Sequence, residues 1–327
     1  MSTHPFRPFL ERQGFVLLDG GLATALEAAG HSLATELWSA RLVLDAPDAV
    51  RAVHTAYLGA GADCITTAGY QASLEGFSRA GLAPAEAEAA LRRPVELAVE
   101  AREIFWSSPR HRAGRLRPLV AASAGPFGAF LADGSEYEGR YGVARARLAD
   151  FHGQGIEILA GTEADLLAFE TIPSLEEAEV VAGLLSEVPH PGAWISFSCR
   201  DDEHLHDGSR LADAVRACAA APGIIGVGVN CTHPRFMSSL VSRIREATDL
   251  PILAYPNSGE VYDPVRGAWT GEGADSAWLA GVPDWIAAGA SVIGGCCRVG
   301  PAVIRELRRL LEADFAPQRR PKARKGN

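Results

Sequence analysis

The sequence predicts an α/β protein with a single (β/α)8 TIM-barrel domain, and three observations lead to this fold class. Eight short apolar segments recur along the 327 residues, and each is followed by an alanine-rich amphipathic segment. The apolar segments are nearly continuous, as expected for parallel strands that are buried on both faces. No internal repeat or linker interrupts the series. Eight successive β–α units are typical of a closed barrel rather than of an open doubly wound sheet.

The strands and helices follow from these segments in chain order. The strands are predicted at residues 15–18, 62–67, 119–123, 165–169, 194–198, 224–229, 252–255 and 291–294. The helices are predicted at 48–58, 84–105, 140–159, 174–186, 209–219, 234–247, 274–288 and 301–311, and several begin with proline or serine, as helices often do. The longest segments predicted to be non-helical all follow strands, at 69–83, 125–139 and 256–273. They are therefore expected at the carboxyl-terminal mouth of the barrel, where active sites of this fold lie.

Composition argues against several classes of protein. No run approaches the roughly 18 apolar residues of a membrane span, and the N-terminus lacks the pattern of a signal peptide, so a cytoplasmic location is expected. Six cysteines, two of them adjacent, suit a reducing compartment better than a disulfide framework. The only two lysines are Lys322 and Lys325, near the C-terminus. Their position argues against a Schiff-base lysine, a pyridoxal enzyme and a P-loop.

Residues 1–316 are assigned to the barrel and residues 317–327 to a basic tail. The tail holds five of the 31 arginine and lysine residues, which leaves 26 against 40 acidic residues and a net charge near −14 for the rest. Such a body repels nucleic acid, so the tail is interpreted as a disordered, solubilising end. Neither a nucleic acid nor a membrane is expected as a partner.

Three cysteines are predicted to lie at strand ends on one rim of the barrel. Cys231 follows GVGVN, and Cys296 and Cys297 follow VIGG in the last strand. One strand separates the sixth strand from the eighth in a barrel, so these thiols can converge although Cys231 and Cys296 are 65 residues apart. Three thiolate ligands with one open coordination position are typical of a catalytic Zn²⁺ site. The other three cysteines show no such grouping and are predicted to be packing residues: Cys64, Cys199 and Cys218.

Other roles and other ligands remain open at this point. Each cysteine of the group can instead be a small core residue, and a disulfide between Cys296 and Cys297 would need a strained ring. His233 and the pair His204 and His206 are competing ligands. However, His233 directly precedes a predicted helix, and the sequence HLHDGS is typical of a solvated turn.

Two carboxylates end apolar runs, where a charge is costly unless it has a partner. Asp19 ends FVLLD, and Glu170 follows LLAF. Each can cap a helix or pair with a rim arginine such as Arg298, or both can receive the ammonium group of an amino acid. The N–H groups of Gly20 and Gly21 would suit a carboxylate. Together these residues predict a pocket for a zwitterion beside a metal ion, whereas a glycosidase pair would not require three thiolates.

Several motifs resemble those of the homocysteine S-methyltransferases, in particular the short type that uses S-methylmethionine or S-adenosylmethionine. They are LLDGGLATALE, ELWSA, TTAGYQAS, AGPFGAFLADGSEYEGRYG, FETIPSLEEA, GVGVNC, YPNSGEVYD and GGCCRVGP, and they extend over residues 15–311. The resemblance implies that Cys231, Cys296 and Cys297 are catalytic ligands of Zn²⁺. It also implies contacts to the amino acid part of homocysteine from Asp19, Gly20, Thr67 and Glu170, with Asn257 as a further neighbour.

The implied reaction moves a methyl group from a sulfonium donor to the thiolate of L-homocysteine and gives methionine. Selenocysteine remains an alternative acceptor. The chain stops soon after the eighth predicted helix, so we expect no cobalamin domain and no folate domain. The expected methyl donor is therefore a free sulfonium compound. Four aromatic side chains are candidates for cation–π contact with the sulfonium: Tyr70, Phe127, Tyr255 and Trp269. A phosphate-binding barrel and a zinc- or thiol-sensing protein are the two other classes that remain open.

Overall fold

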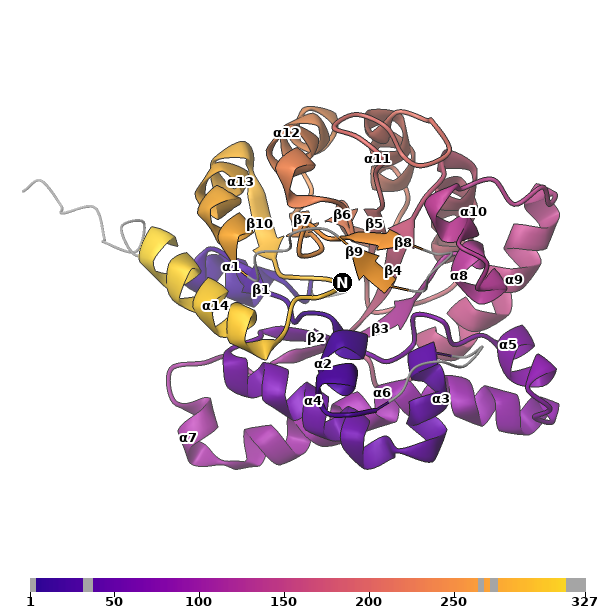
Figure 1. Ribbon diagram of the computed structural model, residues 1–327, viewed down its shortest axis with the longest axis horizontal. Coiled ribbons are helices and arrows are strands. Elements are labelled where there is room, and N and C mark those ends of the chain that lie inside the picture. The colour runs from indigo at the N-terminus through magenta and orange to yellow at the C-terminus, as the bar shows by residue number, and fades with distance from the viewer. Residues whose placement is uncertain (1–3, 32–37, 264–267, 271–275, 316–327) are drawn as a thin grey trace, which may run out of the picture.

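The computed structural model describes residues 4–31, 38–263, 268–270 and 276–315. Eight parallel strands form one sheet in the order β1-β10-β7-β6-β5-β4-β3-β2. A parallel backbone bridge between Leu18 and Cys64 joins the first strand to the last in this order. Figure 1 shows the strands at the centre of the molecule, with helices around them. The predicted (β/α)8 barrel is confirmed.

All eight predicted strands are present. They are β1 Val16–Leu17, β2 Cys64–Thr66, β3 Leu119–Ala124, β4 Leu166–Ile172, β5 Ala193–Phe197, β6 Ile224–Asn230, β7 Ile252–Tyr255 and β10 Ala290–Ile293. The strands β4 and β6 extend past their predicted ends by three residues and one residue, because Ile172 pairs with Phe197 and Asn230 pairs with Tyr255. Most strands have buried side chains on both faces, as expected for parallel strands covered by helices.

Helices lie where the amphipathic segments predict them. They are α4 Pro47–Ala60, α6 Pro84–Ser107, α9 Arg145–Ala160, α10 Leu175–Glu187, α11 Leu211–Ala219, α12 Met237–Ala247, α13 Val282–Ala288 and α14 Pro301–Phe315, with 3₁₀ turns η2 Pro234–Phe236 and η3 Ala277–Gly281 before α12 and α13. The helix α9 begins five residues later than predicted, because Gly139 and Gly142 have φ angles of 69° and 65°. Within the described part of the chain, no helix combines the length and apolarity that a membrane span requires.

The prediction that 69–83, 125–139 and 256–273 lack helices is wrong for the first two segments, and in the third it holds for the described residues 256–263 and 268–270. The first contains α5 Leu74–Arg79, and the second contains α8 Phe127–Leu131 and η1 Ser135–Tyr137. The third contains an antiparallel hairpin of β8 Val261–Asp263 and β9 Ala268–Thr270. These elements have three to six residues. They are too short for a helical or alternating period to show in the sequence.

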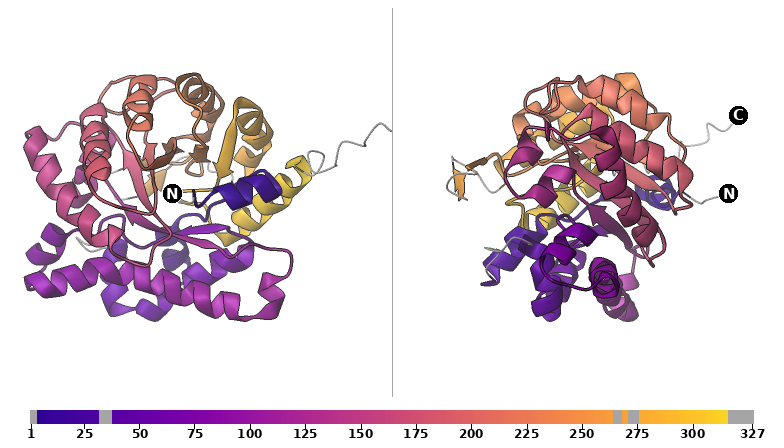
Figure 2. Two further views of the ribbon diagram at one scale, coloured as in Figure 1. Left: turned by 180° about the vertical axis from the view of Figure 1, so that it is seen from behind. Right: turned by 90° about the vertical axis from the view of Figure 1, so that its right-hand side faces the viewer.

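An N-terminal helix closes the amino-terminal end of the barrel. The helix α1 Arg7–Gln13 was not predicted, and neither were α2 Leu22–Ala28, α3 Trp38–Asp45 and α7 Pro109–Arg112. Phe6 and Phe9 pack into the barrel interior, where the rings of Phe6 and Trp194 stack with centroids 5.9 Å apart. Figure 2 shows α1 on the face of the barrel opposite to the β8–β9 hairpin. The opposite end, at the mouth, is therefore the accessible one.

The alternation of side chains along β4 directs a polar side chain into this mouth. Leu166 and Ala168 of β4 lie in the barrel interior, whereas Leu167 and Phe169 face the helices. Successive side chains alternate between the two faces of a strand, so the next inward residue of β4 is Glu170. The tail predicted at 317–327 lies outside the described residues, and the assignment of 1–316 to one domain stays a prediction.

The contact between β1 and β2 relies on a buried carboxylate. Asp63 is 2% exposed, and its Oδ2 accepts hydrogen bonds from the N–H of Leu17 at 3.1 Å and from Gln13 Nε2 at 2.6 Å. Arg308 Nη1 of α14 lies 2.9 Å from both oxygens of Asp63. This side chain therefore ties β2 to β1, α1 and α14.

We predict that Asp63→Ala lowers the free energy of unfolding by about 3–5 kcal/mol, because it removes the buried carboxylate that pairs with Arg308 and leaves that cation only the exposed Glu312. Urea denaturation followed by circular dichroism measures the loss. Asp213→Ala is the matched control, since Asp213 pairs with Arg216 at the surface, and it should cost at most about 1 kcal/mol. Equal losses in the two variants would contradict the role given to Asp63.

Candidate metal centre

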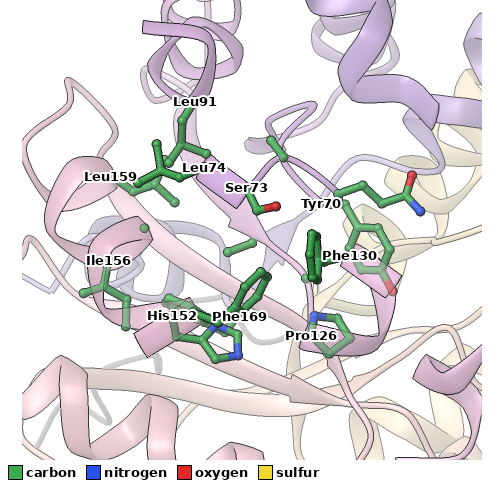
Figure 3. A pocket seen from close by; sticks show the side chains of 16 residues that line it. Tyr70, Ser73, Leu74, Leu91, Pro126, Phe130, His152, Ile156, Leu159 and Phe169 are labelled. Carbon is green, nitrogen blue, oxygen red and sulfur yellow. The ribbon is translucent and has the colours of Figure 1, made fainter. Parts of the chain in front are cut away.

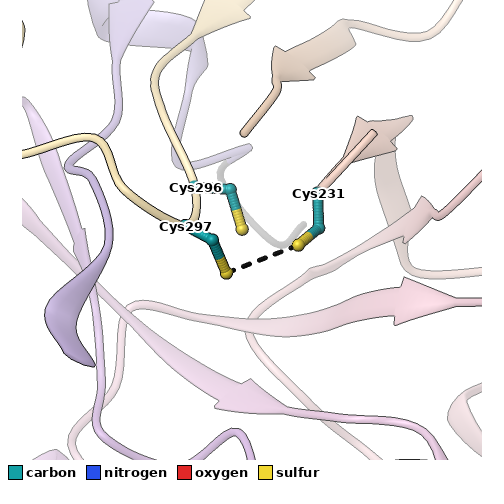
Figure 4. Close-up of side chains that lie close together, drawn as sticks. All are labelled: Cys231, Cys296 and Cys297. Carbon is teal, nitrogen blue, oxygen red and sulfur yellow. Dashed lines mark hydrogen bonds between the residues drawn. The ribbon is translucent and has the colours of Figure 1, made fainter. Parts of the chain in front are cut away.

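Three cysteine sulfurs meet at the mouth of the barrel. Cys231 follows β6, whereas Cys296 and Cys297 follow β10, and β7 lies between these two strands. The three Sγ atoms all lie within 4.8 Å of one another, and those of Cys231 and Cys297 are 3.4 Å apart. Figure 4 shows the three side chains close together at the ends of their strands. The structure therefore brings together the cysteines that the sequence predicts as a group.

The spacing of these sulfurs suits a tetrahedral metal ion. Zinc–sulfur bonds of about 2.3 Å place ligand sulfurs about 3.8 Å apart. The 3.4 Å separation of Cys231 and Cys297 is far longer than a disulfide bond of about 2.05 Å, and all six cysteines are free thiols. Cys231 is buried, while Cys296 and Cys297 are half-buried. The group therefore offers three donors and is open to a fourth on its exposed side.

The histidines considered as competing ligands have other roles. Among the described residues, the only group of three or more side chains arranged to hold a metal ion is that of the three cysteines. His233 Nδ1 accepts a hydrogen bond from the N–H of Arg235 at the start of η2. His204 Nδ1 lies 3.1 Å from the carboxylate of Asp201. His233 thus caps a helical turn, as its position before a predicted helix suggests.

The backbone holds the cysteines in place through the end of β7. The N–H of Cys231 donates to the carbonyl of Tyr255 at 3.3 Å, and that of Cys296 donates to the carbonyl of Pro256 at 2.8 Å. Cys231 has a φ of 47°, in the left-handed region that non-glycine residues rarely adopt. Such strain persists only where surrounding contacts impose it. The ligand segments are therefore fixed by the fold.

The three thiols differ in acidity when no metal is bound. Hydrogen bonds from Cys296 and Cys297 hold the pKa of Cys231 well below the usual value of a thiol. The same bonds to Cys231 raise the pKa of Cys296 and Cys297, and burial raises both further. A bound divalent cation would reverse this, because a coordinated thiol is deprotonated outright.

Two polar side chains lie close to these sulfurs. Burial and the nearby thiols of Cys231 and Cys297 raise the pKa of the Tyr137 hydroxyl, in η1. Asn230 Nδ2 donates to Cys296 Sγ at 3.8 Å. Of the two, only Asn230 carries a signal in the sequence, because it precedes Cys231 at the end of an apolar run. Tyr137 lies in a loop whose contacts no local pattern predicts.

Both predicted carboxylates lie buried at the mouth. Asp19 Oδ2 and Oδ1 accept hydrogen bonds from the N–H and the hydroxyl of Thr66 at 2.9 Å and 3.0 Å. Glu170 Oε2 accepts one from Ser123 Oγ at 2.6 Å. Burial raises the pKa of Asp19 well above its usual value and raises the pKa of Glu170 to about 7. Neither carboxylate caps a helix, so that alternative is wrong.

These carboxylates have no cationic partner in the described part of the chain. Arg298, the rim arginine considered for this role, instead pairs with Glu260 at 2.9 Å. The alternative of an internal salt bridge with Arg298 is therefore wrong. A buried carboxylate that lacks a cation is costly, so the arrangement favours a cationic ligand.

The two glycines after Asp19 serve the packing of the β1–α2 turn. A Cβ atom on Gly20 would lie 2.2 Å from the carbonyl oxygen of Val299, so only glycine fits. The N–H of Gly21 donates to the same carbonyl at 2.9 Å. The prediction that Gly21 offers a free N–H to a ligand is therefore wrong, and the contact implied for Gly20 stays a prediction.

Thr67 and Asn257 are also held by internal hydrogen bonds. Thr67 Oγ1 accepts from the N–H of Ser123 at 3.0 Å, and Asn257 Oδ1 accepts from the N–H of Gly259 at 2.9 Å. Both are buried at the ends of β2 and β7. The structure therefore gives each a structural role, and their predicted contacts to a substrate remain predictions.

The four aromatic candidates differ in position. Tyr70 is buried close to the thiols of Cys231 and Cys297. Tyr255 belongs to the interior cluster beneath the mouth. Phe127 packs edge to face against Phe151 among the outer helices, with centroids 5.1 Å apart, so it does not fit the predicted contact. The side chain of Trp269 lies outside the described residues. Tyr70 and Tyr255 remain candidates.

A small cavity lies outside the barrel wall, between the strands β3 and β4 and the helices α5, α6, α8 and α9. Its volume of about 30 Å³ has room for a water molecule or two. Tyr70, Phe130 and Phe169 are among the side chains that line it, as Figure 3 shows. This cavity is too small for an amino acid and does not include the cysteines.

The chain resembles known proteins along almost its whole length. Homocysteine S-methyltransferase YbgG of Bacillus subtilis is 42% identical over 304 residues, which cover 93% of this chain and 96% of that protein. Selenocysteine Se-methyltransferase of Brassica oleracea is 43% identical, and the alignment covers 92% of this chain and 90% of that protein. The metallated form of the homocysteine methyltransferase MmuM from Escherichia coli superposes with a TM-score of 0.83 at 42% identity, covering 94% and 99% of the two chains.

The match extends to the family as a whole. The family model described as homocysteine S-methyltransferase fits residues 16–311, from β1 to α14. This range includes the three cysteines and both buried carboxylates. The chain is therefore a methyltransferase that belongs to the homocysteine S-methyltransferase family.

Proposed function

We propose that this chain moves a methyl group from a sulfonium donor, S-methylmethionine or S-adenosylmethionine, to the thiolate of L-homocysteine and so forms methionine. The observation that carries the proposal is the group of three cysteine sulfurs within 4.8 Å of one another, beside two buried carboxylates without a cation. Relatives at 42–43% identity are named as methyltransferases of homocysteine or selenocysteine. We infer Zn²⁺ as the ion, since thiolates favour it and three ligands leave a position for a substrate.

Cys231, Cys296 and Cys297 would hold the ion as thiolates. When bound, zinc would keep the thiol of homocysteine deprotonated at neutral pH, so no general base is required. The attack of a thiolate on a sulfonium methyl gives two neutral thioethers, and the opposite charges disappear on the way to the transition state. A buried mouth that excludes water favours this loss of charge.

Glu170 and Asp19 would receive the ammonium group of homocysteine. Their hydrogen bonds to Ser123 and Thr66 hold both carboxylates in position before a ligand arrives. Gly20, Thr67 and Asn257 complete the proposed amino acid site, and Tyr70 lies near enough to the thiols to contact the sulfonium.

The partners are then small molecules alone. No nucleic acid, membrane, cobalamin or folate domain enters the proposal. Six free cysteines, three of them clustered, need a reducing compartment, so we propose a cytoplasmic location.

The two other functional classes have less support. The N–H groups of Gly294 and Gly295, which a phosphate site after β10 would use, already donate to Ala254 and Asp19. A structural or sensing zinc site would need a fourth protein ligand, and the metal-binding group found in the described residues has three.

An assay of the zinc-loaded, reduced protein tests the proposal directly. Both donors are offered with homocysteine and with selenocysteine, and the products are identified by mass. We expect methionine from homocysteine with at least one donor. The absence of product from all four combinations would refute the proposed function.

Cys296→Ser should abolish zinc retention and methionine formation while the chain stays folded, because two thiolates hold the ion too weakly. Zinc content, circular dichroism and product formation are measured together. Cys218→Ser is the control, since Cys218 is buried in α11 outside the cluster, and it should retain zinc. Full activity of the Cys296 variant would rule out the proposed metal site.

Glu170→Gln should raise the KM for homocysteine by about 10- to 100-fold, since a neutral amide replaces an ion pair of about 1.4–2.7 kcal/mol. With a pKa of about 7, Glu170 loses its charge as the pH falls, so kcat/KM should decline below about pH 7. This decline should flatten in the variant if the carboxylate causes it. Glu179→Gln, at an exposed ion pair, is the control and should keep the wild-type profile. An unchanged KM in Glu170→Gln would contradict the assignment.

A further inference from the structure

Cys296 and Cys297 are the first two residues of a tight turn that follows β10. The turn is closed by a hydrogen bond of 3.1 Å from the N–H of Val299 to the carbonyl of Cys296. Its third residue, Arg298, has a φ of 66°, in the left-handed region that favours glycine at this position of a turn. An arginine there is strained, and such strain persists only where other contacts impose it. The contacts of Arg298 must therefore offset this strain.

The side chain of Arg298 is held by a carboxylate from the loop after β7. Its Nε donates to Oε2 of Glu260 at 2.9 Å, and Ser258 Oγ donates to the same oxygen at 2.8 Å. The side chain of Glu260 is only 16% exposed, so it is more shielded from water than Arg298, which is 41% exposed. An ion pair that belongs to such a network is held more firmly than an isolated pair at the surface.

The loop that carries Glu260 also contacts the backbone of the cysteine turn. The N–H of Ser258 donates to the carbonyl of Cys297 at 3.1 Å. Ser258 therefore binds the backbone of Cys297 through its N–H and the carboxylate of Glu260 through its hydroxyl. Together with the ion pair, these contacts form a closed ring of Cys297, Arg298, Glu260 and Ser258. Loss of the ion pair would open this ring directly beside a ligand sulfur.

The opposite side of the turn is held through the backbone alone. Thr24 Oγ1 of α2 accepts a hydrogen bond from the N–H of Arg298 at 2.9 Å. The N–H of Gly21 and the hydroxyl of Tyr57 both donate to the carbonyl of Val299, at 2.9 Å and 3.0 Å. These bonds do not depend on the side chain at position 298. A substitution of that side chain therefore tests the ion pair and leaves the other supports of the turn in place.

We propose that the ion pair of Arg298 and Glu260 positions the turn that carries Cys296 and Cys297 and thereby slows the loss of zinc from the site. Both are positioning residues, because they act through the backbone of the two ligands. Loss of the ion requires a ligand sulfur to move away, and a turn tied to the loop after β7 has less freedom to do so. The inference rests on the proposed function, which takes zinc as the ion of the cysteine group shown in Figure 4.

The test measures how fast the zinc-loaded, reduced protein releases zinc to an excess of a colorimetric zinc chelator. Glu260→Gln removes the charge and keeps the shape, and Arg298→Gly removes the cation and relieves the backbone strain. Arg298→Lys keeps a cation on a side chain of similar reach. Glu179→Gln is the matched control, because Glu179 of α10 pairs with Arg145 at 2.8 Å. Thermal unfolding of the zinc-free proteins is measured in parallel.

We expect Glu260→Gln and Arg298→Gly to release zinc about tenfold faster than the wild type, as is typical when a residue that orients a metal ligand is replaced. Arg298→Lys should stay within about threefold of the wild type, since its ammonium can pair with Glu260. Glu179→Gln should stay within about twofold. Zinc-free Arg298→Gly should unfold near the wild-type temperature, because glycine relieves the strain while it adds entropy to the unfolded chain.

The proposal is overturned if either Glu260→Gln or Arg298→Gly releases zinc less than about threefold faster than the wild type. It is also overturned if Arg298→Lys releases zinc as fast as Arg298→Gly. Faster release that is matched by a large loss of thermal stability in the zinc-free protein would likewise overturn it, since it would reflect a general loosening of the fold. A wild type that retains no zinc would instead refute the proposed metal site, so the two failures are distinguishable.

Discussion

Closure of the sheet between β1 and β2 is the constraint on which the site depends. The strand β1 has two residues and joins β2 through a single backbone bridge. Asp63 at one end and Asp19 at the other accept backbone hydrogen bonds from Leu17 and Thr66 of the opposite strand. These carboxylates supply the bonds that so short a strand cannot make. Since β1 also pairs with β10, the same closure holds the strand that ends in the adjacent cysteines.

Side chains join neighbouring strands elsewhere on the mouth as well. Thr67 accepts a hydrogen bond from the N–H of Ser123, and Asn230 accepts one from the N–H of Thr171. Each of these polar side chains thus satisfies a backbone group and is oriented before a ligand arrives. Preorganised groups of this kind do not have to be rearranged when charge develops in a reaction. Stability and binding are therefore coupled at this rim, and a substitution there is expected to alter both.

Features that depend on period and on position along the chain could be predicted from the sequence. The strands were found because buried parallel strands read as continuous apolar runs, and the cysteine group was found because strand ends of a barrel share one rim. The partners of loop side chains could not be found in this way. Tyr137, the pairing of Arg298 with Glu260 and the five-residue helix α8 depend on contacts between segments far apart in the chain. The helix α1 was missed for the same reason, since Phe9 within it and Phe6 before it are the only buried residues of the segment 4–14.

The charges at the mouth also bear on how a product would leave. Asp19 and Glu170 have raised pKa values because they are buried, and neither has a cationic partner among the described residues, so a cationic ammonium group would stabilise their charged forms. In the proposed reaction, methyl transfer would remove the negative charge from the substrate sulfur and leave a neutral thioether, which is a weaker ligand than a thiolate for a zinc ion. The ammonium contacts of substrate and product would be the same. The difference in affinity between the two would therefore arise at the sulfur, where a zinc ion held by the three cysteines would bind the product less tightly than the substrate.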